Sequence, residues 1–289
     1  RQVGESASAD RNVDDRVVDS FGQEWSRFDN RRLDRDELLK MFDAYTSIFP
    51  FDDLPEGAVG FDAGCGSGRW ARFFAERVGT LHCVDASGEA IDVARTTLVD
   101  SPNVRFHHQD LTDMDIAPGS CDFGYSLGVL HHIPDTERAL RACVERLKPG
   151  APFLVYLYYR PEDAGAGRRL LLQVVTLVRH VLARLPWRLK RLVTDCIAAL
   201  VYFPLARMAA LVERAGCDPG WLPLFQYRSR SFYVMRNDAL DRFGTRLEKR
   251  FSQAEVLTLL AEAGLEDIRF SPEPPWWVAV GRRAGGADG

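Results

Sequence analysis

The segment from Asp62 to Gly68 contains the residues best suited to chemistry, an acid followed by glycines at 64, 66 and 68. It comes directly after an apolar stretch typical of a strand and opens a stretch typical of a helix. Glycines let a backbone approach a ligand closely, and the start of a helix favours a negative group. We therefore expect a loop that holds a nucleotide-like ligand.

The acids near this loop indicate the charge of that ligand. The glycine spacing differs from the dinucleotide pattern G-x-G-x-x-G, and a carboxylate at Asp62 would repel a pyrophosphate but attract an ammonium or sulfonium group. Asp85 lies 21 residues after Gly64, where such folds place a carboxylate against ribose hydroxyls. Asp110 follows the next predicted strand. Three acids at successive strand ends suit a cationic adenosine ligand.

The elements that must position these acids alternate between strands and helices. We predict strands at 58–62, 80–85, 104–107, 122–126, 152–158, 266–270 and 276–280, with helices at 69–78, 88–98, 136–147 and after Ser252. Alternation predicts a parallel sheet covered on both faces, and right-handed crossovers make it doubly wound. The fold class is therefore α/β.

The chain divides into four predicted segments. Residues 1–54 form an N-terminal helical segment, and residues 55–160 form the core. Residues 161–236 form a helical insertion, expected to be a substrate cap, with helices near 170–185, 189–200 and 205–215. Residues 237–289 complete the core, where Ser252 to Glu255 is typical of a capping box.

Composition excludes several classes of protein. With 289 residues, 46% hydrophobic and 27% charged, the chain is typical of a folded globular protein. A net charge of −4 provides no general attraction to nucleic acid. The six cysteines include no C-x-x-C pair, which favours a cytoplasmic location, and no residue spacing requires a metal. The apolar runs are interrupted before membrane-spanning length, so no transmembrane segment is expected.

The segment 168–191 contains seven arginines or lysines and no acid. One interpretation is a solvated helix surface around an apolar core face. The other is a cap that meets an acidic lipid, a phosphate-bearing substrate or a membrane surface, because a basic amphipathic helix suits all three. Peripheral membrane contact through this segment therefore stays open, as does the oligomeric state.

Taken together, these motifs resemble the class I S-adenosylmethionine-dependent methyltransferases, most closely the small-molecule enzymes of ubiquinone and menaquinone biosynthesis and of natural-product pathways. The matching segments are Asp62 to Gly68, Val84 to Ser87, Gln109 to Leu111, Ser126 to Asp135 and Leu147 to Gly150. The resemblance implies a mostly parallel seven-stranded sheet, Rossmann-like, with a helical insertion after the fifth strand.

The resemblance also implies roles for single residues. Gly64, Cys65, Gly66 and Gly68 would surround the methionine part of S-adenosylmethionine, with Asp62 at its amino group. Asp85 would hold the ribose hydroxyls, and Ala86 is a further cofactor-binding candidate. Asp110 and Leu111 would lie at the adenine, and Leu127 and Gly128 beside the sulfonium.

Two histidines and three further aromatic residues are candidates for the chemistry and for substrate contact. His131 and His132 follow the fourth strand at the topological switch point, where histidine could act as a base or support the cofactor. Tyr158, Tyr159 and, as part of a lid, Trp25 are candidates for substrate contact. Each has a packing role as its alternative. Asp135 suits the start of a helix better than catalysis.

These observations predict methyl transfer from S-adenosylmethionine to a small lipophilic molecule, at an undetermined oxygen, nitrogen or carbon atom. A nicotinamide-dependent oxidoreductase, a catalytically silent cofactor-binding partner protein and a nucleic-acid methyltransferase are the alternatives. The last lacks an Asn/Asp-Pro-Pro-aromatic tetrad after the fourth strand.

Overall fold

The structure is a computed structural model, and it describes residues 11–28, 34–160 and 175–285. Two compact units emerge: one comprises Arg1–Glu162 with Leu247–Gly289, and the other comprises Asp163–Arg246. We call them the sheet unit and the helical unit. The boundary that the sequence suggested at 236/237 falls inside a helix, α9 (Phe232–Gly244).

A seven-stranded sheet forms the centre of the sheet unit, in the order β3-β2-β1-β4-β5-β7-β6. Its strands are β1 (Val59–Ala63), β2 (Thr80–Asp85), β3 (Val104–His108), β4 (Phe123–Leu127), β5 (Pro152–Tyr156), β6 (Leu265–Phe270) and β7 (Val278–Arg283). The first five pair in parallel, whereas β7 is antiparallel to β5 and β6. The predicted mostly parallel, doubly wound fold is confirmed.

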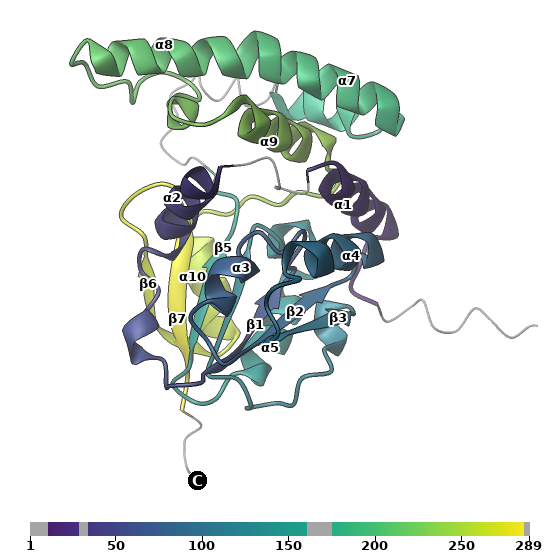
Figure 1. The fold of residues 1–289 in the computed structure, drawn as a ribbon, viewed down its shortest axis with the longest axis vertical. Coiled ribbons are helices and arrows are strands. Elements are labelled where there is room, and N and C mark those ends of the chain that lie inside the picture. Colours follow the sequence, from purple (N-terminus) through teal and green to yellow (C-terminus); the bar gives the residue numbers. More distant parts are fainter. Residues whose placement is uncertain (1–10, 29–33, 161–174, 286–289) are drawn as a thin grey trace, which may run out of the picture. The chain divides into compact units, whose positions relative to one another are not determined.

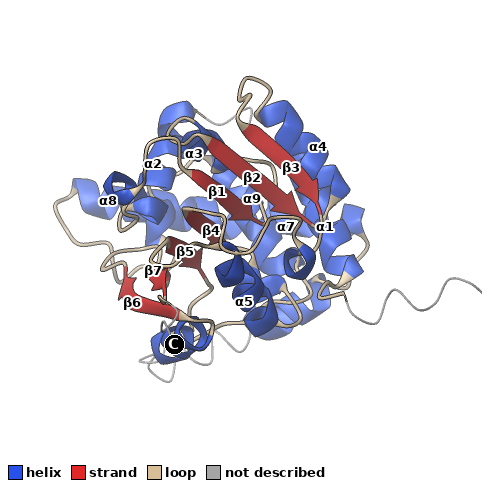
Figure 2. Cartoon of the chain, turned by 90° about the horizontal axis from the view of Figure 1, so that it is seen from below, coloured by secondary structure: helices blue, strands red, loops and turns tan. Residues whose placement is uncertain are grey.

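Helices cover both faces of this sheet (Figure 2). The helices of the sheet unit are α1 (Asp15–Arg27), α2 (Arg35–Thr46), α3 (Ala71–Ala75), α4 (Gly88–Thr97), α5 (Thr136–Arg146) and α10 (Gln253–Glu262). Their starts follow the capping chemistry expected from sequence: Asp135 accepts from Arg138 N at 2.9 Å, and Ser252 with Glu255 forms a capping box. The helix-start role predicted for Asp135 is therefore confirmed.

Alternation along β1 and β4 assigns side chains to two apolar layers. Phe61 and Ala63 belong to a buried cluster with residues of α5 and α10, such as Leu140 and Leu260. On the other face, Tyr125 stacks on Phe74 of α3, with ring centroids 3.9 Å apart. Asp62 lies between Phe61 and Ala63 in the strand. The same alternation therefore directs its carboxyl to the face opposite α5, where it is buried.

The helical unit contains one long continuous helix with α9 beside it (Figure 1). The long helix comprises α7 (Trp187–Ile197), a π-helical turn, η4 (Ala198–Tyr202), and α8 (Phe203–Arg214). A shorter helical stretch covers residues 175–182. Residues 168–174, which belong to the predicted basic segment and to the predicted helix at 170–185, lie outside the described residues.

Two helices predicted separately at 189–200 and 205–215 are therefore one helix, and that prediction was wrong. Proline removes a backbone donor and clashes with the carbonyl four residues earlier, which usually ends a helix. Here Pro204 follows the wide turn of η4 and stands in the first turn of α8. A π-helical turn spaces its hydrogen bonds five residues apart, so it accommodates the ring.

Candidate functional site

The glycine loop connects β1 to α3 in a conformation that requires glycine. Gly64 has φ +87°, and a Cβ atom there would lie 2.4 Å from Val129. The amides of Gly64 and Cys65 both donate to the carbonyl of Val84, at 2.8 and 3.0 Å. The loop is therefore folded back onto the end of β2, with its backbone close to the sheet edge.

Asp85, the last residue of β2, holds the loop in place. Its Oδ2 accepts from the amide of Gly66 and its Oδ1 from that of Ser87, each at 2.9 Å. Burial raises the pKa of this carboxyl, and the two backbone hydrogen bonds partly offset that effect. Since each carboxylate oxygen can accept two hydrogen bonds, Asp85 keeps capacity for ribose hydroxyls. Ala86 follows, and its carbonyl contacts His108 Nε2 at 3.0 Å.

Asp62 is the deepest acid of the site, with only 2% of the residue exposed. Its Oδ2 has no hydrogen-bond partner among the described residues. Burial raises its pKa to about 8, while the neighbouring Tyr125 hydroxyl lowers it and the Asp85 carboxylate raises it further. Near neutral pH the unliganded carboxyl is therefore largely protonated. A cation placed beside it would restore the charged form.

At the end of β3, the N-terminal segment engages Asp110. Its Oδ2 accepts from the amide of Asn12 at 2.7 Å, and its Oδ1 accepts from Thr112 at 2.9 Å. The Asn12 side chain also bonds both backbone groups of Asp135, at 2.7 and 2.8 Å. Leu111 is buried beside this acid. The predicted adenine end of the site therefore lies under residues from the start of the described chain.

Trp25 of α1 lies over the glycine loop. A Cβ atom on Gly66, which has φ +53°, would come within 2.9 Å of the indole. The guanidinium of Arg69 lies between two rings, 5.2 Å from the centroid of Trp25 and 4.5 Å from that of Trp70. Helix α1 packs beside α4 within the sheet unit (Figure 1). This is where a lid over a bound cofactor would lie.

Aromatic rings gather at the carboxyl ends of β4 and β5. Beyond Leu127 and Gly128, the 3-10 turn η3 (Leu130–His132) carries both histidines, which are buried. The ring of His131 stacks on Tyr158 with centroids 3.9 Å apart. The ring of His132 lies 5.0 Å from Phe21. We call this group, completed by Tyr45 and Tyr156 with centroids 5.0 Å apart, the ring cluster.

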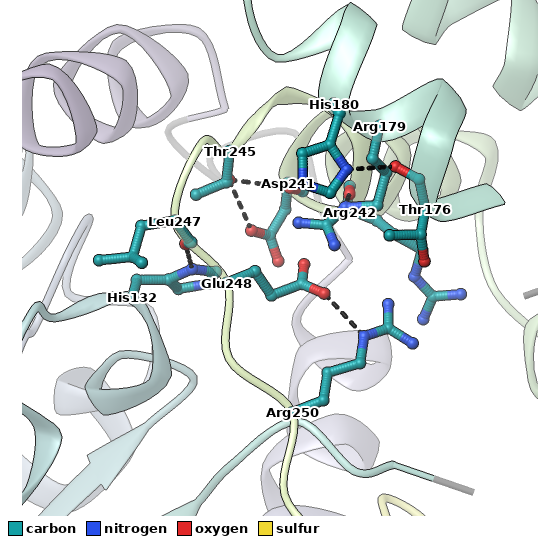
Figure 3. Close-up of polar contacts among 10 residues, drawn as sticks. All are labelled: His132, Thr176, Arg179, His180, Asp241, Arg242, Thr245, Leu247, Glu248 and Arg250. Atoms are coloured by element: carbon teal, nitrogen blue, oxygen red, sulfur yellow. Dashed lines mark hydrogen bonds and ion pairs between the residues drawn. The ribbon is translucent and has the colours of Figure 1, made fainter. Parts of the chain in front are cut away.

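The segment Leu247–Phe251 fixes the two histidines. His132 Nδ1 contacts the Leu247 carbonyl at 2.6 Å, as Figure 3 shows. The Lys249 amide donates to the His131 carbonyl at 2.9 Å, and the Phe251 amide donates to Tyr158 at the same distance. A carbonyl only accepts, so Nδ1 of His132 carries the hydrogen and, in the neutral ring, Nε2 carries the lone pair.

The structure brings together most predicted site residues, with one exception. Tyr159 lies beyond the end of β5, where its ring is 6.2 Å from Trp277 and its backbone forms an isolated bridge to Phe251. Sequence reasoning did not select Asn12, Phe21, Tyr45 or Tyr156 as site residues. Only Phe21 had a signal, its helical spacing with Trp25. Within the described part of the chain, no cluster of three His, Cys, Asp or Glu residues could hold a metal ion.

Comparisons with known proteins match the central part of the chain to a methyltransferase domain. Residues 61–155 match the family model of the methyltransferase domain. The ubiquinone biosynthesis O-methyltransferase of Xanthomonas campestris is 34% identical over 112 residues, which cover 38% of this chain and 47% of that protein. Phosphoethanolamine N-methyltransferase 2 of Caenorhabditis elegans is 30% identical over 126 residues, or 43% of this chain and 28% of that protein. The chain thus spans less than half the length of these two relatives.

Among solved structures, the chain is similar to one from the complex between the Haloferax volcanii Trm112 methyltransferase activator and the putative methyltransferase. The TM-score is 0.51 at 16% identity, and the match covers 92% of this chain and 98% of that chain. That likeness concerns the fold alone. The domain match and the Xanthomonas relative support the resemblance to class I S-adenosylmethionine-dependent methyltransferases: residues 61–155 match a methyltransferase domain. The residues fit this cofactor. A buried acid with an unsatisfied oxygen lies beside a glycine loop in which Gly64 and Gly66 have positive φ, and a Cβ atom at either position would lie less than 3.0 Å from a neighbouring side chain.

Proposed function

We propose that this protein transfers the methyl group of S-adenosylmethionine to a small lipophilic molecule bound at the ring cluster. The observation that carries the proposal is the gathering of Phe21, Tyr45, Tyr156 and Tyr158 around two buried histidines, next to the glycine loop. Ligand sites are typically lined by aromatic side chains with a few placed polar groups. The cofactor supplies an electrophilic methyl group on a sulfonium. The protein binds the two reactants, orients them and excludes water.

Within this proposal, the glycine loop holds the methionine part of the cofactor through Gly64, Cys65, Gly66 and Gly68. Asp62 binds the ammonium group of that methionine part. Asp85 with Ala86 holds the ribose. Asp110 with Leu111 meets the adenine, and Leu127 with Gly128 lies beside the sulfonium. Trp25 closes over the loop. Six free thiols support a cytoplasmic location.

Replacing Asp85 with alanine should weaken S-adenosylmethionine binding by about 1.5 to 3 kcal/mol, roughly 10- to 150-fold, through lost charge-assisted hydrogen bonds. Calorimetric titration of the folded variant measures the effect. Asp92→Ala, which removes an exposed acid from α4, is the matched control and should bind normally. Unchanged affinity in Asp85→Ala would exclude Asp85 from the cofactor site.

His132 is the residue we propose as general base for a hydroxyl or amine nucleophile, acting through Nε2. His132→Asn keeps a donor near the position of Nδ1 and removes the base. It should lower kcat by about 10² to 10⁴ and leave cofactor affinity unchanged. His132→Gln is the companion variant, because its amide reaches toward the Nε2 position. Normal kcat in His132→Asn would assign this histidine to packing.

The function itself is tested by formation of S-adenosylhomocysteine with an acceptor panel of phenols, amines and enolisable ketones. Turnover that Tyr158→Ala slows mainly by raising KM would support an acceptor site at the ring cluster. Cofactor binding with no turnover on any acceptor would favour the catalytically silent partner. The match to a methyltransferase domain argues against the alternative of a nicotinamide-dependent oxidoreductase.

A further inference from the structure

The helical unit presents a long helix with two unlike faces. The 28 residues Trp187–Arg214 extend about 42 Å at 1.5 Å per residue. The inner face consists of residues at intervals of three or four, all buried: Lys190, Thr194, Ala198, Tyr202, Ala206 and Ala209. A spacing of four drifts by about 40° per step around a regular helix. The wide turn η4 absorbs part of this drift, and α7 and η4 pack against α9.

The opposite side, which we call the outer face, is apolar and exposed. It carries Leu189, Leu192, Leu200, Met208 and Leu211, of which Leu200 is 75% and Leu211 62% exposed. By length and composition the whole helix could cross a membrane, and only 22% of its most apolar window is buried. Contiguous exposed apolar surface of this kind marks an interaction site.

The inner face argues that the helix lies on a bilayer and does not cross it. Lys190 Nζ donates to the Gly244 carbonyl at 2.8 Å, and Asp195 forms a two-pronged ion pair with Arg236 at 2.9 and 3.0 Å. Immersing such groups in hydrocarbon is costly. A helix with one protein-bound polar face and one apolar face suits the plane of a membrane interface.

Charge identifies the kind of surface. Residues 163–246 contain 14 arginines or lysines and 6 acids, whereas the remainder of the chain contains 23 and 35. Exposed Arg188 and Arg191 lie beside the first leucines of the outer face, and exposed Arg214 follows the last. Arginines that flank an apolar face can reach phosphate headgroups while the leucines enter the acyl boundary.

We propose that the outer face docks the helical unit onto the surface of an anionic phospholipid bilayer, with the helix lying in the interface plane. This goes beyond methyl transfer, because it concerns where the protein works and not what it does. It extends one of the interpretations of the basic segment, contact with a lipid surface, to the outer face of this helix.

Vesicle flotation of the full chain tests the surface. The protein should float with vesicles of phosphatidylcholine mixed with phosphatidylglycerol and bind vesicles of phosphatidylcholine alone much more weakly. Leu192→Asp with Leu200→Asp should abolish flotation. The control is Val99→Asp in the sheet unit, because Val99 is 75% exposed, as is Leu200. Equal flotation of both variants would overturn the proposal.

Arg188→Gln with Arg191→Gln tests the charge. Each basic residue near an anionic surface contributes about 1 kcal/mol, so the pair should weaken binding roughly 25-fold at low salt, with the loss shrinking as salt rises. Binding that these changes leave intact would overturn the anionic preference.

Cys196 offers a direct probe of depth, because it is an exposed thiol between Leu192 and Leu200. In a Cys217→Ser background, an environment-sensitive fluorophore on Cys196 should brighten and shift to the blue with anionic vesicles. The same dye on Cys217, in a Cys196→Ser background, should change little. Three results would each overturn docking in the interface plane. They are an unchanged fluorescence at Cys196, a dimer that Leu192→Asp dissociates, and bound protein that alkaline carbonate does not release.

Discussion

Replacing Gly66 with valine is expected to abolish S-adenosylmethionine binding while the sheet unit stays folded. Gly66 has φ +53°, a conformation that costs a side-chain-bearing residue about 1 to 2 kcal/mol and a β-branched one more. The new side chain would also collide with Trp25 and fill the space through which the backbone must approach the cofactor. Calorimetry reports binding, and circular dichroism melting reports the fold.

Two companions separate obstruction from strain. Gly57→Val places the same side chain at φ +71° with no atom within 4 Å, so it should cost stability and spare binding. Gly66→Val combined with Trp25→Ala removes the collision with the indole but not the obstruction, and should still fail to bind. Retained affinity in folded Gly66→Val would mean that the loop is an ordinary turn.

The strand ends of the sheet could be predicted because local signals agree there. Apolar runs bounded by turn residues place β1, β2 and β3 in order, and the carboxyl ends of parallel strands meet at one edge of a sheet. Asp62, Asp85 and Asp110 therefore reach the same edge whatever the loops do. The helix starts at Asp135 and Ser252 could be predicted for the same reason, since capping depends on residues within one turn.

The remaining parts of the site depend on contacts without a local signal. Asn12 meets Asp110, 98 positions away, and Leu247 meets His132 across 115 positions. Neither partner belongs to a periodic pattern or a motif, so only the folded chain reveals the pairing. The long helix escaped prediction for a different reason: proline ordinarily ends a helix, and no sequence rule signals a π-helical turn before Pro204.

The pKa of Asp62 makes the stability of the unliganded protein depend on pH in a stated direction. This pKa is about 8 in the folded protein, against 3.8 for the unperturbed group. Below about pH 4 the carboxyl is protonated in both states and costs nothing. As pH rises from the lower of these two pKa values to the higher, Asp62 ionises in the unfolded chain but stays protonated in the folded protein. The free energy of unfolding therefore falls by about 1.4 kcal/mol per pKa unit, which amounts to several kcal/mol over the interval. Asp62→Asn should therefore gain stability relative to wild type across that interval, as urea unfolding would show.

Cofactor affinity should follow the opposite trend, because the ionised carboxylate is the form that attracts an ammonium group. Below the pKa of Asp62 in the folded protein, the affinity of the wild type for S-adenosylmethionine should increase with pH, by at most about tenfold per pH unit. At that limiting slope, one proton is released for each cofactor molecule bound. The rise should flatten near pH 8, where Asp62 is ionised and the cofactor's own amine, with a pKa of about 7.7 to 8.0, begins to lose its charge. Asp62→Asn should bind more weakly and show no rise. Calorimetry in two buffers with different protonation enthalpies counts the released proton directly. A flat wild-type profile with no proton release would show that Asp62 does not meet the ammonium group, and the acid would then serve the packing around Tyr125 alone.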